Sequence, residues 1–422
     1  MDQEKRPRSC HRYRTSQKKE TVRGSRQICI AMTASEYEEI WSDATQVRQH
    51  LDTLIEQSPE LFPAEVREGY HLSGHLPESK KLPGIRLRQL QTSHGTYTLR
   101  PSFVMSYMSG TVSDLEYPLL LLSFGVPCWV VTMIYGRNEM YWHRHLERLG
   151  RNSLVGTTVP LGHRLPPHLV ADEHHADWCG EKGYVAFTTG DGCILGLALS
   201  AKADEDHLRP AYDIFAQEAR ALAPDYQPET VTVDGWIATR NVFVQLFTRI
   251  TPILCFLHGF LSIRDRSRKE HGLHQALWQV YHSDNDQQFR ERMAQFWQDC
   301  QQGNWSEAVM AKIEKFCHRV EDYALSYQYP GCHRTSNLVD RLMNRLTRYL
   351  YDNRGIHGHL TSSERRLRGW ALLQNFRPFA PRSGVDRPYQ SPAHRLNQKQ
   401  YDAHWLHNLQ ISASLAGKIS CT

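Results

Sequence analysis

The chain of 422 residues is long enough for two or three domains with cores of their own. Its composition, 40% hydrophobic and 23% charged, excludes a chain that is disordered throughout and is typical of a folded protein. The net charge of +5 is uneven, because residues 1–27 hold nine Lys/Arg against three acids and residues 331–422 hold fourteen against five. Basic ends around an acidic centre suit a protein that contacts phosphates and holds metal ions, although a basic tail without a specific use explains the ends equally well.

Two features bear on location. Residues 117–136 (YPLLLLSFGVPCWVVTMIYG) approach the roughly 20 apolar residues of a membrane span, but Gly125 and Pro127 interrupt them, so we expect no membrane helix. The ten cysteines form no C-x-x-C pair, and the N-terminus has no apolar leader. We therefore expect reduced thiols in a cytoplasmic protein.

The N-terminal part is predicted to be a basic, flexible arm (1–30) followed by a mostly helical DNA-binding region (31–160). Helical periodicity covers 33–60, and short strands and turns are expected over 82–110. Residues 117–150 give short helices joined by a Gly-containing turn, a pattern typical of a helix-turn-helix unit in the DNA major groove, although helices that simply pack together give it too. The candidates for DNA contact on the last helix are Arg137, Arg144 and Arg148.

From residue 165 the pattern becomes β, β-hairpin, α, β, α, β. A short apolar strand is expected to end at Asp172, and strand ETVTVDG to end at Asp234. Gly190, Asp191 and Gly192 separate the two strands of the hairpin. A carboxylate at the edge of an apolar sheet is costly unless something compensates it, so the two aspartates are candidate functional residues.

A third acid lies on the helix predicted for TSNLVDRLMNRLTRYL, residues 335–350. Thr335 or Ser336 is expected to cap this helix, and Asp340 lies on the face opposite the apolar stripe. Taken alone, Asp340 is most simply a surface acid paired with Arg341 or Arg345. The apolar stripe consists of Leu338, Leu342, Leu346 and Tyr349.

These residues in their order resemble the RNase H-like, DDE-type transposases, in particular the Mutator-type (MULE-like) insertion-sequence transposases. In that family the first acid lies on the first strand, the second after the fourth strand and the third on a helix after an all-α insertion, which matches Asp172, Asp234 and Asp340. TSNLVD matches the family's T-[TS]-N-x-x-E with Asp in place of Glu, and CFLH supplies its Cys-x-x-His.

The resemblance covers roughly residues 165–380 and implies an α/β, RNase H-like mixed sheet. The implied parts are the first part of the catalytic core (165–264), an all-α insertion (265–334) and the last core helices (335–380). Residues 381–422 are rich in Pro and polar residues and are predicted to form an extended tail.

The implied chemistry is cleavage of DNA phosphodiesters at element ends and joining of the freed 3′-OH to target DNA. Two Mg²⁺ (or Mn²⁺) ions supply charge stabilisation for such a reaction, and hard oxygen ligands hold them. Asp172 is the candidate to bridge both ions, Asp234 to bind one and Asp340 to bind the other. The implied partner is double-stranded DNA, bound by a homodimer or larger oligomer at the nucleoid.

Other acids compete for these positions. Glu173 and Asp177 follow Asp172, but strand alternation points Glu173 to the opposite face and Asp177 falls beyond the predicted strand. Glu321 precedes the helix motif, and Glu364 is better explained as a first-turn helix charge.

Cys255, His258 and Asn337 are predicted to support the site. A structural zinc site is the alternative for Cys255 and His258, and it would need further ligands from Cys317/His318 or Cys332/His333, whose spacing is not that of ordinary zinc ligands. The basic residues expected to contact phosphates in this part are Arg341, Arg345 and Arg366.

Three functions follow from the sequence. The first is a transposase, the second an RNase H-like nuclease without strand transfer, and the third a DNA-binding protein derived from a transposase with a decayed site. The third arises because Asp340 is one methylene shorter than the expected Glu, which can misplace a metal ion.

Overall fold

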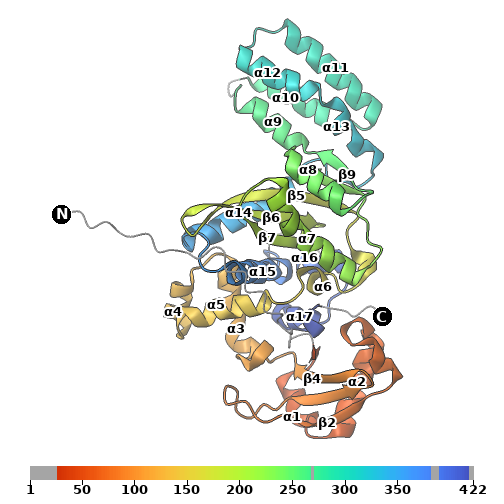
Figure 1. Ribbon diagram of the computed structural model, residues 1–422, viewed down its shortest axis with the longest axis vertical. Helices are drawn as coiled ribbons and strands as arrows, with labels where there is room; N and C mark the ends of the chain where they lie inside the picture. Colours follow the sequence, from red (N-terminus) through yellow and green to blue (C-terminus); the bar gives the residue numbers. More distant parts are fainter. Residues whose placement is uncertain (1–25, 268–269, 382–388, 418–422) are drawn as a thin grey trace, which may run out of the picture.

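The computed structural model of the protein describes residues 26–267, 270–381 and 389–417. Figure 1 shows a helical body, a central sheet covered by helices and an N-terminal body following one another along the long axis. Helices and two mixed sheets make this an α/β protein, which confirms the expected class. Most of the predicted basic arm, residues 1–25, lies outside the described residues.

The central sheet carries two of the predicted acids. Its five strands lie in the order β7-β6-β5-β8-β9; β5, β6 and β7 are antiparallel neighbours, whereas β8 runs parallel to β5 and β9 parallel to β8. The strands are β5 (His168–Trp178), β6 (Glu181–Gly190), β7 (Cys193–Ser200), β8 (Thr230–Val233) and β9 (Thr251–Leu254).

Strand β5 is longer than the sequence predicted. The strand was expected to end at Asp172, but it continues to Trp178, because its polar second half pairs with β6. The pairing of β5 with β8 ends with Val170 opposite Thr232. Two residues further on in this register, Asp172 is level with Asp234, which directly follows β8. The parallel pairing therefore stops where the two acids begin.

The turn between β6 and β7 has the conformation expected of a tight hairpin. Asp191 and Gly192 have φ angles of 48° and 86°. Two consecutive positive φ angles are what a type I′ turn requires, and Asp-Gly is a favoured pair for it. The predicted hairpin is confirmed.

Helices cover both faces of the central sheet. Along β5, Leu169 and Ala171 enter the core on one face and Val170 enters the core on the other, as the alternation of a strand requires. Asp172 therefore points to the same side as Val170. That side is covered by α14 (Asn337–Asp352) and α15 (Leu360–Phe376), and the opposite side by α7 (Glu205–Leu222) and α8 (Ile237–Leu246).

Residues 26–101 form a smaller α/β unit, in which helices lie within 33–60 and strands within 82–110, as the sequence predicts. Strand β1 falls inside the predicted arm and pairs in parallel with β4, about 70 residues further along the chain, a contact that local sequence patterns do not reveal. The sheet order is β1-β4-β3-β2. Its elements are β1 (Gln27–Ile30), α1 (Ala34–Ile40), α2 (Ala44–Gln57), β2 (His71–His75), β3 (Arg88–Thr92) and β4 (Gly95–Pro101).

The segment that imitated a membrane span forms two short helices that Gly125 (φ 92°) and Pro127 separate, and no helix among the described residues is long and apolar enough to cross a bilayer. The third helix of this group, α5, packs tightly on α15. The absence of a side chain at Gly369 of α15 permits this approach, since a Cβ there would come within 2.1 Å of the carbonyl oxygen of Leu146 in α5. The helices are α3 (Val112–Ser123), α4 (Cys128–Tyr135), α5 (Glu139–Leu149) and α6 (Leu154–Thr158).

The helical body seen at the top of Figure 1 lies between β9 and α14, and it has its own core around Phe256, Phe289 and Phe316. The described residues of this segment contain no strand. The helices are α9 (Phe256–Arg264), α10 (His271–Tyr281), α11 (Asp286–Gln302), α12 (Glu307–Cys317) and α13 (Val320–Ala324).

The C-terminal segment is not an extended tail where it is described. It forms α16 (Pro392–Asn397) and α17 (Trp405–Ser412). Trp405, Leu406 and Leu409 enter the core beside α15, while Ile411 enters the core of the N-terminal sheet. The prediction is wrong because these few apolar residues sit in a polar sequence and find their partners only in the tertiary structure.

Candidate active site

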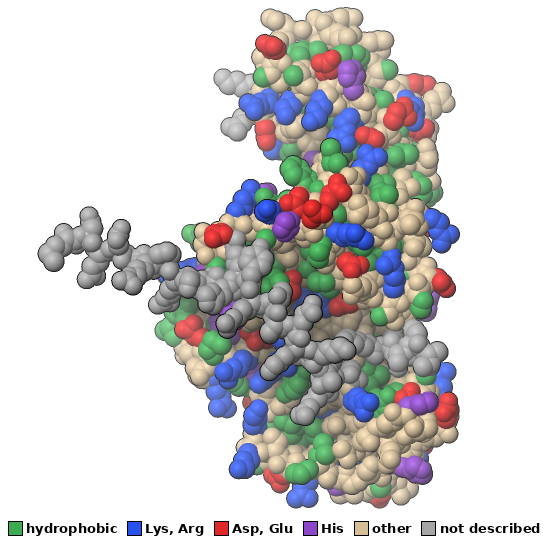
Figure 2. Space-filling model, viewed as in Figure 1, with side chains coloured by type: hydrophobic (Ala, Val, Ile, Leu, Met, Phe, Trp, Pro, Cys, Tyr) green, Lys and Arg blue, Asp and Glu red, His purple; other side chains and the backbone are tan. Residues whose placement is uncertain are grey.

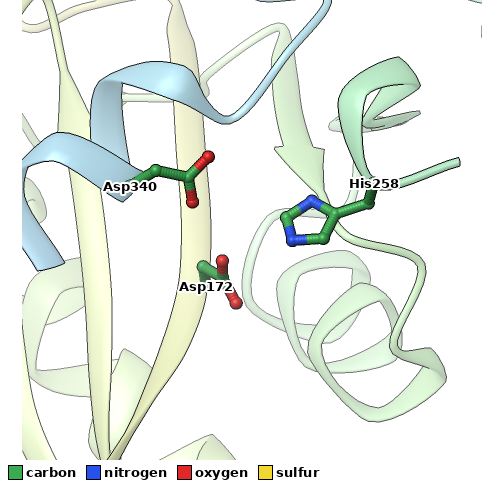
Figure 3. A group of neighbouring side chains, drawn as sticks. All are labelled: Asp172, His258 and Asp340. Atoms are coloured by element: carbon green, nitrogen blue, oxygen red, sulfur yellow. The ribbon is translucent and has the colours of Figure 1, made fainter. Parts of the chain in front are cut away.

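Three side chains from distant parts of the chain meet over the central strand β5, where its pairing with β8 ends (Figure 3). Asp172 comes from β5, His258 from the first turn of α9 and Asp340 from the first turn of α14. One ligand atom of each residue lies within 4.8 Å of the others. The structure thus brings together two of the three predicted acids and one residue that was assigned only a supporting role.

Backbone geometry places His258. The Cys255 N–H donates a 2.8 Å hydrogen bond to the Val233 carbonyl, so this residue still follows β9 alongside β8. Helix α9 starts at Phe256, which turns the chain and brings His258 over the end of the sheet. Strand β9 therefore ends at Leu254, just before the C-x-x-H residues.

A hydrogen-bond network ties His258 to Asp340. Ser336, at the N-cap position of α14, does not cap the helix with its side chain; its hydroxyl donates to Oδ2 of Asp340 at 3.0 Å. The same hydroxyl lies 3.3 Å from His258 Nδ1, and the Cys255 thiol donates to it at 3.3 Å. His258 Nδ1 is also 3.4 Å from the Cys255 sulfur. Nδ1 is therefore engaged on the protein side, which leaves Nε2 for the carboxylates.

Asp234 lies beside this cluster without being one of its three members. Its Oδ1 accepts a 2.8 Å hydrogen bond from the Trp236 N–H, which fixes the turn after β8. Asp234 and His258 line the same groove. Its charge acts on both Asp172 and His258, as their pKa shifts show.

The electrostatics of the cluster are those of crowded acids. Burial, followed by the repulsion of Asp234, raises the pKa of Asp172 to about 7. The hydrogen bond with Cys255 and the charges of Cys255, Asp172 and Asp234 raise the pKa of His258 to about 9 in spite of burial. At neutral pH the imidazolium of His258 is thus the positive charge that faces these carboxylates.

The donor set fits a divalent cation. Asp172 is a desolvated carboxylate whose negative charge is unfavourable in the protein alone, and a cation would relieve that cost. Carboxylate oxygens of Asp172, Asp234 and Asp340 are the hard ligands that Mg²⁺ and Mn²⁺ prefer, while the protonated ring of His258 has no free nitrogen to offer a metal ion.

Both competitors of Asp172 lie outside the cluster. Glu173 points to the opposite face of the sheet, as strand alternation predicted, and accepts hydrogen bonds from Tyr212 and from Thr239. Asp177 is exposed and accepts a 2.8 Å hydrogen bond from the Gly180 N–H in the turn after β5.

Neither competitor of Asp340 approaches the cluster. Glu321 forms an ion pair with Arg290 on the surface of the helical body. Glu364 accepts a 3.1 Å hydrogen bond from the Leu199 N–H at the edge of the sheet. Asn337 is exposed at the first residue of α14 and belongs to none of the contacts just described.

The zinc alternative for Cys255 and His258 finds no further ligands. Among the described residues, the one group of three metal-binding side chains with clustered ligand atoms consists of Asp172, His258 and Asp340. Cys332 donates to the Ser326 carbonyl instead. Seven described cysteines are free thiols, but Cys179 is disulfide-bonded, so the expectation of reduced cysteines is wrong there.

The exposed face of α14 carries a cluster of arginines next to Asp340. Burial and the neighbouring charges of Arg341 and Arg348 lower the pKa of Arg345. Burial and Arg345 also lower the pKa of Arg377 to about 10. Within the described part of the chain, none of the three α14 arginines forms an ion pair with a carboxylate. A phosphate group would complement this charge.

The other predicted DNA-contact arginines differ in their exposure. Arg137 and Arg144 are exposed near the start and on the outer face of α5, whereas Arg148 is half-buried. Arg366 donates to the His357 carbonyl and lines a cavity of about 340 Å³ between α4, α5, α14 and α15. Arg366 is therefore engaged by its own chain.

Sequence reasoning missed that His258 joins the acids and that Ser336 links them. One signal was available: in C-x-x-H and in S-x-x-x-D the paired residues are three and four positions apart, so on a helix they share a face. The meeting of the two segments, about 80 residues apart, depends on the tertiary structure.

A scan of the chain against protein-family models finds no match, and no curated protein matches it significantly. The geometry of the site is therefore the basis for a functional assignment.

Proposed function

We propose that this protein is an RNase H-like DDE-type DNA transposase that cleaves phosphodiester bonds at the ends of a mobile element and joins the 3′-OH ends to target DNA. The observation that carries the proposal is the convergence of Asp172 and Asp340 beside Asp234 at the end of the parallel pairing of β5 with β8. The strand order, with an antiparallel hairpin on one side of β5 and parallel strands on the other, supports the same family.

Asp172, Asp234 and Asp340 would hold divalent cations, Mg²⁺ or Mn²⁺. When bound, such ions supply positive charge next to the attacking and leaving oxygens of a phosphodiester. The chain itself fixes the carboxylates, because β5 positions Asp172, the turn at Trp236 orients Asp234 and Ser336 orients Asp340.

Two surfaces supply DNA contacts in this proposal. The arginines of α14 offer positive charge next to Asp340. Trp236 is 52% exposed two residues after Asp234, and its indole N–H donates a 2.7 Å hydrogen bond to the Ala203 carbonyl. An exposed, fixed indole beside the acids is a platform on which a base can stack.

Asp in place of Glu at position 340 does not separate the third acid from the first, since ligand atoms of Asp340, Asp172 and His258 lie within 4.8 Å of one another. This geometry argues against the decayed-site alternative. A nuclease without strand transfer would use the same cluster.

The test is an assay with labelled duplex DNA that carries the sequences flanking the reading frame, with Mg²⁺, with Mn²⁺ and with EDTA. Metal-dependent joining of 3′-OH ends supports the transposase, and cleavage without joining would instead identify a nuclease. Binding without cleavage would contradict both. Asp177→Asn is the matched control, because this exposed aspartate lies on the same strand as Asp172.

A further inference from the structure

A groove leads from the acids into the helical body. Asp234 and His258 line one end, Gly259 and Ser262 of α9 line one wall, and α12 lines the other, around a volume of about 160 Å³. This volume corresponds to about five water molecules at roughly 30 Å³ each. The groove is thus an extension of the acidic site.

Helix α12 turns its basic stripe to this groove. Lys312, Lys315 and Arg319 are spaced by three and four residues, so they share one face of the helix or its immediate extension, and all three line the groove. Arg319 donates a 3.1 Å hydrogen bond to Asp322. In the part of the chain that the structure describes, neither lysine forms an ion pair. The positive charge of the two lysines and Arg319 in the groove therefore exceeds the negative charge of Asp234, the one acid among the described residues that line it.

A close contact joins this basic stripe to the acidic cluster. Gly235 follows Asp234 and has φ 99°, and a Cβ there would lie 3.2 Å from a terminal nitrogen of Arg319. The Arg319 guanidinium thus rests against the backbone next to Asp234. Figure 2 shows Lys and Arg side chains across the helical body, above a group of acidic side chains at its junction with the central part.

We propose that this groove binds backbone phosphates of the DNA strand next to the bond that is cleaved, so that the helical body holds the strand in register with the acids. The inference rests on the proposed function, and it adds the path of the strand. A cluster of carboxylates repels a polyanion, and cations a few ångströms away offset that repulsion. Contacts of Lys and Arg with phosphates position a strand without reading its sequence.

The test measures DNA binding in EDTA, where metal-dependent cleavage does not interfere. Fluorescence anisotropy with a labelled duplex that ends at the cleavage position gives the affinity at several salt concentrations for the wild type, Lys312→Gln, Lys315→Gln and the double variant. Each lost lysine–phosphate contact is expected to reduce the slope of log K against log salt by about 0.9 and to weaken binding about three- to tenfold at moderate salt. Equal effects on unrelated duplexes are expected.

Lys182→Gln is the matched control. Lys182 is an exposed lysine of β6 that lies opposite Asp177 at the far end of β5. Asp177 is close to Gly355, just beyond the end of α14, because a Cβ on Gly355 would touch it. Asp340 lies in the first turn of α14, about 18 Å from the end of this helix at 1.5 Å per helical residue. Lys182 is therefore far from the acidic cluster. This variant is expected to bind DNA with the wild-type affinity and slope.

The outcomes separate this inference from the proposed function. If the wild type cleaves DNA while the double variant keeps the wild-type affinity and slope, the groove does not bind the strand. The same conclusion follows if Lys182→Gln weakens DNA binding as much as the groove variants do. If the wild type neither binds nor cleaves DNA, the proposed function fails and this inference fails with it. Thermal unfolding of each variant shows whether a loss of binding reflects loss of the fold.

Discussion

The Ser336 hydroxyl donates a 3.0 Å hydrogen bond to the carboxylate of Asp340, one turn further along α14. The same hydroxyl lies 3.3 Å from Nδ1 of His258 and accepts a hydrogen bond from the Cys255 thiol. A single buried serine thus connects the acid of the TSN-type motif with the Cys-x-x-His pair. It explains why the two motifs, distant in sequence, belong to one site.

Ser336→Ala is expected to lower metal-dependent DNA cleavage about tenfold, because Asp340 loses its positioning hydrogen bond, worth roughly 1.5 kcal/mol for a charged acceptor. The concentration of Mg²⁺ that gives half-maximal rate should rise. Thr335→Ala is the control, since the Thr335 side chain has no part in the network described above. Equal rates and equal Mg²⁺ dependence in Ser336→Ala and the wild type would show that the network has no role.

Asp172→Asn is expected to abolish cleavage and yet to stabilise the fold in EDTA. The pKa of Asp172 is about 7 in the folded protein against an ordinary value of 3.8, so the folded state holds more protons between these values. The free energy of unfolding of the wild type should therefore fall as the pH rises from about 4 to 7, and the fall should be smaller in the variant.

Thermal or urea unfolding of both proteins at pH 5 and pH 8 measures this difference. Above pH 7 the variant should be more stable by about 1–3 kcal/mol, within the limit set by 1.36 kcal/mol per pKa unit. Asp177→Asn, on the exposed end of β5, should show no such gain. A variant less stable than the wild type at pH 8 would contradict a strained carboxylate at this position.

Asp340→Glu restores the residue that the family resemblance leads one to expect, but it is expected to lower cleavage by about tenfold or more. In this structure the shorter side chain already meets Asp172, His258 and Ser336, so an added methylene must displace one of them, and metal geometry tolerates only small shifts. Steady-state cleavage rates with Mg²⁺ and Mn²⁺ measure the effect. A more active variant would instead mean that Asp340 is a partly decayed ligand.

Trp236→Ala is expected to weaken binding of DNA at the cleaved end by about 1–3 kcal/mol, the usual contribution of a base stacked on an aromatic side chain. Trp236→Phe keeps a stacking face and should retain most of the affinity. The comparison is made by anisotropy in EDTA with the same duplex. Equal affinity of the alanine variant and the wild type would remove Trp236 from the DNA contact.

The central fold could be predicted from local patterns. Two continuous apolar runs on either side of the Asp191-Gly192 turn specify the hairpin, and the 3.6-residue periodicity of residues 205–222 specifies α7, without reference to the rest of the chain. The strand-end position of Asp234 also followed from its apolar neighbours. These features depend on interactions between residues close in sequence, which is why they were accessible.

The remaining features depend on contacts between distant segments. β5 continues through polar residues beyond Asp172 because β6 supplies hydrogen-bond partners, and β1 exists because β4 does. In the same way, Ile411 of the predicted tail finds its core only in the N-terminal sheet. To predict that His258 lies among the acids, one would need to know the first residue of α9 to within one position.

In the proposed function, Asp172 and Asp340 hold a divalent cation that is used for DNA cleavage. Titration of free Mn²⁺ by electron paramagnetic resonance, with cleavage measured in the same samples, compares the wild type with Asp172→Asn, Asp340→Asn and the control Asp177→Asn. The first two variants are expected to bind Mn²⁺ at least about tenfold more weakly and to lose cleavage, while the control matches the wild type. Wild-type Mn²⁺ affinity together with wild-type cleavage in Asp340→Asn would contradict the proposed function.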